Sequence, residues 1–425
     1  MFGPGIVGLQ QTTNYRVVLP FYIYASVSFL AGTLLLFLRT DIANDHYFYP
    51  PTLAITHIMA LGWGTMIILG ASHQLLPVLI EGKLYSNRLA FMTFGFTCLG
   101  IPLLVFGFYI FRTGWIMQLG ALLVNLGVLL YVSNVFLSAF KSEKRNVHAW
   151  FIITASLWLL ATTTFGLLLV INFDHTIFPK ESLAYLSVHA HLGLVGWFLL
   201  LVIGVGSRLI PMFLISKYTN EKALWTIYGL VNAGLIVFIL ARMVNRSLEF
   251  LAIIPILTGI VVFGHHCFKA YAVRIRKAVD EQMKASLLSI IHMLLPFVVL
   301  IMSLWVLPSG GQPNLVLLYG FSILFGWITA IILGMTFKTL PFIVWNKVYH
   351  KKAYTGKAPL PKDLFSEKMY HYMLMAYILG FGVFVIGIIL LNQWLLKIGA
   401  AALLMTAILY VLNTTKILIH KPRKI

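Results

Sequence analysis

The stretch HIMALGWGTMIILGASHQLLP, residues 57–77, sets the architecture of the chain, because its frame occurs three times. The second copy is HLGLVGWFLLLVIGVGSRLIP (191–211) and the third is FSILFGWITAIILGMTFKTLP (321–341). Counted back from the final proline, each copy has Gly-Trp at the same place and a glycine seven residues before the proline. The copies begin 134 and then 130 residues apart. Small residues recur in membrane helices in general, but the shared register indicates an internal triplication.

The composition is that of a membrane protein. Hydrophobic residues make up 60% of the sequence and charged residues only 10%, and the mean hydropathy is +0.92. Soluble domains carry about 25% charged residues. Cys98 and Cys267 both fall inside predicted spans, so neither a disulfide nor a thiolate metal site is expected. The first apolar run has no basic flank followed by a cleavage site, and therefore does not resemble a cleaved secretory signal.

Twelve apolar runs are long enough to cross a bilayer as helices, since each crossing needs about 20 residues. Their approximate cores are 17–38, 52–76, 89–110, 115–137, 149–171, 184–210, 223–242, 248–270, 286–306, 314–340, 370–391 and 395–415. They predict an all-α integral membrane protein in which spans 2, 6 and 10 are equivalent. We expect one transmembrane domain over residues 1–425, built from three pseudo-threefold four-helix repeats at about 14–140, 146–272 and 284–415. Each frame proline is expected to end its helix at the inner interface.

The net charge of +19 reflects orientation in the membrane and not affinity for nucleic acid. With the amino terminus inside, six of the 31 Lys and Arg residues lie on the outer side: Arg39, Arg112, Lys180, Arg242, Arg246 and Lys397. The other 25 lie on the inner side, as the positive-inside rule requires. Both termini and the loop 343–368 are therefore predicted to be cytoplasmic, in what we expect to be a bacterial inner membrane. The lipid bilayer is the first partner, with anionic lipid as a secondary one.

Three histidines lie inside predicted spans at comparable depth: His57 in span 2, and His189 and His191 in span 6. At a rise of 1.5 Å per residue, each lies roughly 8–10 Å from the outer end of its span. An imidazole at such depth is costly unless it is paired, so these residues are candidates for function. Hydrogen bonding across helices is the structural alternative, and it accounts less well for three imidazoles at one level on two equivalent helices.

The spacing of His189 and His191 limits what they can bind. Two residues along a helix rotate the side chain by about 200°, so the rings point to opposite sides of span 6 and cannot chelate one metal ion on one face. A helical zinc site would need i, i+3 or i+4 spacing. A heme with one axial imidazole from a helix suits the geometry, and neutral histidine is an ordinary heme ligand. Because no C-x-x-C-H attachment motif is present, b-type heme held noncovalently, or a modified form of it, is predicted.

The segments THIMALGWGTMIILGASHQLLPVL (56–79) and VHAHLGLVGWFLLLVIGVGSRLIP (188–211) resemble the heme-copper oxidase subunit I superfamily, in its divergent cytochrome c oxidase subunit I-like members. In architecture the likeness covers the whole chain. A second similarity is to the NnrS family of heme- and copper-containing membrane proteins linked to nitric oxide. The resemblance implies a subunit I-like fold with heme, for which His57, His189 and His191 are the iron-ligand candidates. Trp63 and Trp197 are further cofactor-binding candidates, because Gly-Trp places a flat indole beside a close helix contact.

The chain departs from the pattern of these oxidases in its other ligands. In the family, span 2 gives a heme ligand, which His57 matches, span 10 gives HxH, and spans 6 and 7 give three histidines for copper. Here Phe321 occupies the frame position of span 10, the HxH lies on span 6, and span 7 has no histidine. His265 and His266 lie on span 8 near the inner face, which is the wrong face to substitute, and His148 at the inner edge of span 5 is expected to be hydrated. Copper in a three-histidine set and oxygen reduction by this chain alone are therefore not expected.

The favoured function is heme binding in respiratory electron transfer, or in O₂ or NO chemistry at an outer-leaflet heme. A cytochrome electron donor or other respiratory subunits are the expected partners, and whether the chain is a heme-dependent oxidoreductase stays open. A cofactor-free transporter is one alternative, although the spans hold almost no acidic residues and no pair of broken midplane helices. A noncatalytic or assembly subunit of a respiratory complex is the other.

Two arrangements of the heme-facing histidines stay open. In a pseudo-threefold structure the equivalent residues His57 and His191 point into successive gaps, and His189 is rotated from His191 by about 200°. The three repeats can follow one another in either direction around the pseudo-threefold axis. One direction places His57 and His189 in the gap between spans 2 and 6, which is the pairing that we favour. The alternative pairing is His57 with His191.

Overall fold

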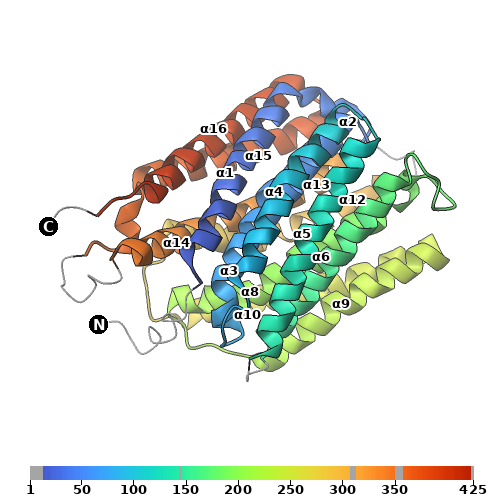
Figure 1. Ribbon diagram of the computed structural model, residues 1–425. Helices are drawn as coiled ribbons and strands as arrows, with labels where there is room; N and C mark the ends of the chain where they lie inside the picture. The colour runs from blue at the N-terminus through green and yellow to red at the C-terminus, as the bar shows by residue number, and fades with distance from the viewer. Residues whose placement is uncertain (1–12, 143–145, 307–312, 350–357, 423–425) are drawn as a thin grey trace. The chain divides into compact units, whose positions relative to one another are not determined.

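The computed structural model describes residues 13–142, 146–306, 313–349 and 358–422, and these are predominantly helical (Figure 1). Within them, twelve helical segments are long and apolar enough to cross a membrane. The predicted all-α fold with twelve spans is therefore confirmed. Parts of the basic segment 141–145, of the loop 343–368 and of the C-terminal tail lie outside the described residues.

The helices form two compact units. The first unit consists of residues 1–18 and 72–279, and the second of residues 19–71 and 280–425. In the first unit, α4, α5 and α6 pack side by side (Figure 1). Its helices are α4 (Asn87–Tyr109), α5 (Trp115–Phe140), α6 (Val147–Ile171), α7 (Leu186–His191), α8 (Leu200–Leu214), α9 (Glu221–Val244) and α10 (Ile253–Ala272), with the 3-10 turns η4 (Ser182–Tyr185) and η6 (Arg246–Ala252).

In the second unit the neighbouring helices α15 and α16 form a close pair (Figure 1). The unit boundaries cut α1 and α3, so each of these helices contributes to both units. The helices are α1 (Tyr15–Leu38), α2 (Pro50–His57), α3 (Met66–Leu79), α11 (Glu281–His292), α12 (Leu295–Val306), α13 (Pro313–Phe321), α14 (Thr329–Tyr349), α15 (Glu367–Leu390) and α16 (Gln393–Leu418), with the turns η2 (Thr40–Asn44) and η10 (Pro361–Leu364).

Each copy of the repeated frame contains a π-helical segment at the same place. These segments are η3 (Ile58–Thr65), η5 (Leu192–Leu199) and η8 (Ser322–Ile328). All three contain the Gly-Trp pair, and the three indoles are buried. The π-helix is rare and is found mostly as a short irregularity at functional sites. Its occurrence at three equivalent positions shows that the sequence repeat is also a repeat of local structure.

The glycine seven residues before the frame proline brings the first two spans of each repeat together. In each copy a Cβ at this glycine would collide with the preceding span of the same repeat: Gly70 with Phe21 of α1, Gly204 with Phe151 of α6, and Gly334 with Ser286 of α11. Only glycine permits so close an approach. The same residue at the same position therefore fixes the same helix pair three times.

The frame prolines do not end their helices, which corrects the prediction. The α-helices continue from Pro77 to Leu79, from Pro211 to Leu214 and from Pro341 to Tyr349. A proline within a helix leaves the carbonyl four residues before it without its N–H partner. For Pro77 this is the carbonyl of His73, to which Thr13 Oγ1 donates at 2.6 Å. At Pro77 another donor thus replaces the missing N–H.

The last two spans of the first and third repeats are joined by an asparagine clamp. Asn134 of α5 accepts from the backbone N–H of Ser86 and donates to its carbonyl, both at 3.0 Å. Asn413 of α16 makes the same pair of bonds with Ser366, at 2.8 and 3.1 Å. Ser86 and Ser366 are the N-caps of α4 and α15. Each clamp therefore ties the start of one span to the end of the next.

The last two spans of the middle repeat are connected in a different way. The clamp asparagines lie in the motifs YVSN (131–134) and YVLN (410–413), 48 and 47 residues after their N-cap serines. The same count from Asn220, the N-cap of α9, reaches Phe268 or Cys267, neither of which is an asparagine. There the loop before α9 is joined to the loop after α10 by the backbone, since the Ile275 N–H donates to the Ile215 carbonyl at 3.1 Å. Ser216 and Arg274 form the accompanying antiparallel bridge.

Candidate functional site

His57 is the last residue of α2 and directly precedes the π segment η3. Its Nδ1 lies 2.7 Å from the carbonyl oxygen of Leu53, one turn earlier. Because a carbonyl only accepts, Nδ1 carries the proton and the neutral ring has its lone pair on Nε2. Such a hydrogen bond on one ring nitrogen is the usual way in which a protein orients a histidine that binds metal through the other.

His191 repeats this arrangement in the first unit. It is the last residue of α7 and directly precedes η5, and its Nδ1 lies 2.8 Å from the carbonyl oxygen of Ser187. The equivalent histidines therefore share their place before a π segment, their distance in sequence from the buried indole, and their tautomer. Sequence reasoning found both residues but not the shared hydrogen bond, which depends on side-chain rotamers.

His189 and His191 face different helices, as their spacing predicts. A Cβ at Gly166 of α6 would lie 2.7 Å from Cε1 of His189, so this imidazole packs directly on α6. The ring of His191 instead lies 4.4 Å from the ring of Phe238 on α9. The two imidazoles therefore do not form one chelating pair. His57 belongs to the second unit, and which of the three histidines face one heme stays a prediction.

The two tryptophans proposed as cofactor neighbours have well-defined packing partners. The Trp63 indole stacks on Phe29 at 4.4 Å and donates from Nε1 to Thr329 Oγ1 at 3.2 Å. The Trp197 indole meets the ring of Tyr131 edge-on at 6.0 Å. Both tryptophans are thus part of the helix packing after their histidines, and their contact with a cofactor stays a prediction.

In the third copy, a phenylalanine stands where the other copies have histidine, and it belongs to an aromatic stack. Phe321 stacks on Phe325, Phe381 and Phe384, at centroid distances of 4.8, 5.6 and 4.5 Å. His292 of α11 stacks on the same Phe381 at 5.4 Å. Span 10 therefore offers apolar rings where spans 2 and 6 offer an imidazole.

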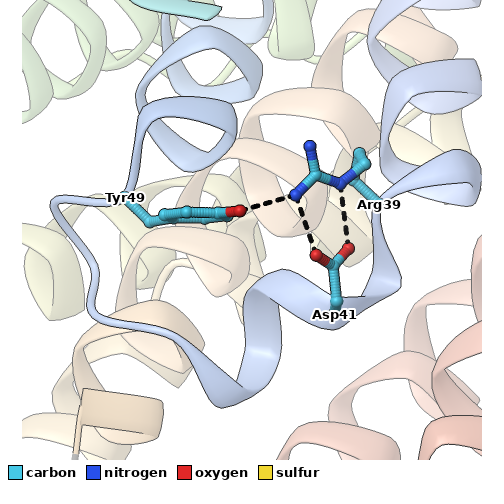
Figure 2. A network of polar contacts seen from close by, with 3 residues as sticks. All are labelled: Arg39, Asp41 and Tyr49. Carbon is cyan, nitrogen blue, oxygen red and sulfur yellow. Dashed lines mark hydrogen bonds and ion pairs between the residues drawn. The ribbon is translucent and has the colours of Figure 1, made fainter. Parts of the chain in front are cut away.

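A polar network fixes the start of the helix that carries His57 (Figure 2). Arg39 forms a two-pronged pair with Asp41, from Nε at 3.1 Å and from Nη2 at 2.8 Å, and Nη2 also donates to the hydroxyl of Tyr49 at 2.7 Å. Tyr49 is the residue that precedes Pro50 at the beginning of α2. The hydrogen bond from Arg39 holds the pKa of Asp41 below its usual value. The network thereby joins the end of α1 to the start of α2.

His148 is buried, which corrects the expectation that it is hydrated. Its side chain belongs to α6 and is only 8% exposed. Its Nδ1 lies 3.1 Å from the carbonyl oxygen of Gly204 and 3.2 Å from Ser207 Oγ, both on α8. The expectation was wrong because the close approach of α6 and α8 at Gly204 encloses this end of the helix.

Within the described residues, no group of three or more His, Cys, Asp and Glu side chains could hold a metal ion. The absence of a three-histidine copper centre was expected from span 7, and it stays a prediction to be tested by metal analysis.

No family model matches the chain, and no curated protein matches it. Among solved structures, one similar chain comes from a cryo-EM structure of a heme-copper terminal oxidase dimer. The TM-score is 0.67, with 96% of this chain and 84% of that chain covered, at 10% sequence identity. In fold, this chain resembles a heme-copper terminal oxidase. The predicted subunit I-like fold is thus confirmed, whereas the similarity to the NnrS family stays an expectation.

Proposed function

We propose that this chain is a heme-binding integral membrane protein of the subunit I-like type, acting in respiratory electron transfer or in the chemistry of O₂ or NO. One observation carries the proposal. His57 and His191 stand at equivalent positions of two repeats, and each donates from Nδ1 to the carbonyl one turn earlier. The oxidase-like fold supports a heme in general.

The residues fit an iron-porphyrin cofactor in their donor chemistry. Neutral imidazoles with the lone pair on Nε2 are the form that binds heme iron, and the carbonyls of Leu53 and Ser187 keep the rings in that form and orientation. When bound, the heme supplies a one-electron redox centre and a binding position for a diatomic gas. The buried indoles of Trp63 and Trp197 lie six residues further along each span, where they pack among neighbouring helices.

The finer features of the proposal follow from the sequence. The heme is b-type and noncovalent, the electron donor is a cytochrome or another respiratory subunit, and both termini face the cytoplasm of a bacterial cell. The resemblance to the NnrS family supports NO beside O₂ as the gas. The favoured heme-facing pair is His57 with His189, and His57 with His191 is the alternative.

A noncatalytic respiratory subunit is the second candidate function, and the third repeat favours it. Phe321 stands where a third frame histidine would be, and it is packed among Phe325, Phe381 and Phe384. An oxidase fold with an incomplete ligand set can still transfer electrons or bind a gas without reducing oxygen by itself.

Absorption spectra of purified protein, expressed with added heme, test the proposal. We expect a Soret band that is lost or shifted in His57→Ala and unchanged in His175→Ala, which removes an exposed loop histidine. Loss in His189→Ala supports the favoured pair, and loss in His191→Ala supports the alternative. An unchanged spectrum in both His57→Ala and His189→Ala would contradict the favoured pair. A heme-replete preparation without a Soret band would rule out the function.

A further inference from the structure

Two loops of the middle repeat meet at the end of the spans that is predicted to be cytoplasmic. The first loop connects α8 to α9, and the second follows α10. The Ile275 N–H donates to the Ile215 carbonyl at 3.1 Å, and Ser216 and Arg274 form the bridge beside this bond. The helices α9 and α10 also pack against each other. The two loops and the adjoining helix ends therefore form one continuous surface.

This inner-loop surface, made of residues 212–222 and 268–277, is strongly cationic. It contains six Lys and Arg residues and a single carboxylate, Glu221. In the part of the chain that the structure describes, five of the six cations form no ion pair: Lys217, Lys222, Lys269, Arg274 and Lys277. Their positive charge is therefore available to an anion from outside the chain.

The backbone holds Arg274 in place without neutralising it. Its Nη1 donates to the Tyr271 carbonyl at 2.8 Å, and its Nη2 donates to the Lys277 carbonyl at 3.2 Å. The guanidinium carbon also lies 3.8 Å from the centre of the Tyr271 ring. Carbonyls and an aromatic ring orient a guanidinium but leave its full charge. Arg274 is thus a positioned cation between the two loops.

The same surface exposes two isoleucines beyond the ends of their spans. Ile215 directly follows the span Ser182–Leu214, and Ile275 lies three residues after the span Arg246–Ala272. Their exposed fractions are 53% and 61%. Side chains within a span face lipid tails, whereas these two lie past the helix ends, at the level of the lipid head groups. Exposed apolar residues beside cations are typical of a surface that contacts anionic lipid.

The backbone of Ile215 has a conformation that isoleucine disfavours. Its φ of 52° and ψ of 49° are left-handed, which is unusual for a β-branched residue, and glycine is the common choice at such a helix end. The turn itself belongs to the repeat, because Glu81 stands at the same distance after its frame proline and has a φ of 51°. The fold thus requires the turn but not the isoleucine. A strained and exposed isoleucine indicates a role for its side chain.

We propose that the inner-loop surface binds one anionic phospholipid. The phosphate lies among Lys217, Arg274 and Lys277, and the acyl chains begin against Ile215 and Ile275. Lys and Arg form charge-assisted hydrogen bonds with phosphate oxygens, and basic pockets between membrane helices on the cytoplasmic side bind anionic head groups. A free anion would use the cations alone, whereas the two isoleucines add contact area only for a lipid. The site lies in the first unit and does not rest on the proposed heme function.

Thermal melting of the purified full chain in a neutral detergent tests the proposal. Phosphatidylglycerol or phosphatidylcholine is added at the same molar ratio. A ligand that binds only the folded state raises the Tm, so we expect phosphatidylglycerol to raise it more than phosphatidylcholine does. Most of this difference should be lost in the double variant Lys217→Gln with Lys277→Gln. It should also shrink in high salt, which screens exposed charges.

A matched double variant controls for the general charge of the inner side. Lys362→Gln with Lys368→Gln also removes two exposed cations that are predicted to be cytoplasmic, and it should keep the full difference between the two lipids. Equal loss in this control would overturn the site and assign the effect to the overall charge. Glycerol 3-phosphate, which has the head group without acyl chains, should give no comparable shift. An equal shift would assign the surface to a free phosphate compound.

Ile215→Gly tests the apolar part of the site and keeps the proposal testable if the lysine variant does not fold. Glycine suits the left-handed turn, so this variant should melt at a higher temperature than the wild type when no lipid is added. It should then gain less from phosphatidylglycerol, because the contact with the acyl chains is gone. An undiminished gain from phosphatidylglycerol in the folded variants at both the lysines and Ile215 would refute the lipid site. The heme proposal is untouched by that result, since its test is the Soret band.

Discussion

At the scale of single residues, backbone carbonyls and one ion pair prepare His57 for its proposed role. The Leu53 carbonyl sets the tautomer of His57, and the pair of Arg39 with Asp41 fixes the start of its helix through Tyr49. Pairs of this kind at a surface contribute about 0.2–1 kcal/mol each. Their importance here is therefore positional, because a small shift of α2 moves the imidazole.

Asp41→Asn should lower stability slightly at neutral pH and have no effect in acid. Hydrogen bonding to Arg39 lowers the pKa of Asp41 in the folded protein. The carboxylate therefore stabilises the fold above the ordinary aspartate pKa, and this contribution is lost as the pH falls through the lowered value. Since the side chain is 52% exposed, the loss at pH 7 should be at most about 1 kcal/mol. Melting curves at pH 7 and below pH 3 measure it.

The control for this prediction is the same substitution in an Arg39→Gln background. Without the guanidinium the largest cause of the lowered pKa is gone, so the pH-dependent difference should shrink. A pH-dependent difference of undiminished size in that background would assign the effect to another group.

Single residues were only partly predictable from the sequence. The depth of His57, His189 and His191 follows from counting residues along a helix, and so does the divergence of the last two. The Nδ1 bonds of His57 and His191 depend on rotamers and could not be foreseen. His148 was assigned to water because it stands at a helix end, whereas the approach of α6 to Gly204 of α8 buries it.

At the scale of helices, the repeated glycine does more to fix the packing than the repeated proline. The prolines leave the helices continuous, while the glycines each allow a neighbouring span to approach to contact. Twelve spans could be predicted because apolar length alone identifies them. The π segments could not, since they depend on how the turn after each frame histidine packs. The asparagine clamps had a signal in the similar motifs YVSN and YVLN, which lie outside the repeated frame.

Gly204→Ala should destabilise the protein, and Gly229→Ala should not. A Cβ at Gly204 collides with Phe151, so α6 and α8 must separate, at a cost of about 1–3 kcal/mol. Gly229 lies within α9 with no atom within 4 Å of an added Cβ. There the better helix propensity of alanine should be neutral or stabilising by up to about 1 kcal/mol. Thermal melting in detergent compares the two, and equal melting temperatures would refute the packing role of Gly204.

At the scale of the whole molecule, the charges predict the direction of the chain across the bilayer. The 25 basic residues assigned to the inner side outnumber the six on the outer side, and basic loops remain in the cytoplasm. With Cys98 and Cys267 replaced by alanine, Lys362→Cys should react with an impermeant maleimide only after the cells are opened. His175→Cys should react in intact spheroplasts. The reverse pattern would invert the topology.

The histidines present in the spans predict that the chain neither binds copper in a three-histidine site nor reduces oxygen by itself. We expect no stoichiometric copper in the purified protein and no oxygen consumption when a reductant is added, because span 7 has no histidine and the third frame position is Phe321. Elemental analysis and an oxygen electrode test this together. Stoichiometric copper accompanied by oxygen consumption would show that a complete oxidase centre is present.

The backbone connection of the middle repeat has a consequence for which substitutions the chain tolerates. In the outer repeats a side chain makes the bonds, so replacing Asn134 or Asn413 removes them. In the middle repeat, the peptide groups of Ile215 and Ile275 make the bond, and a peptide group is the same whatever residue carries it. A substitution removes this bond only where it removes the N–H, as proline would at position 275. The middle repeat therefore keeps its last two spans connected whatever other side chains stand at these two positions.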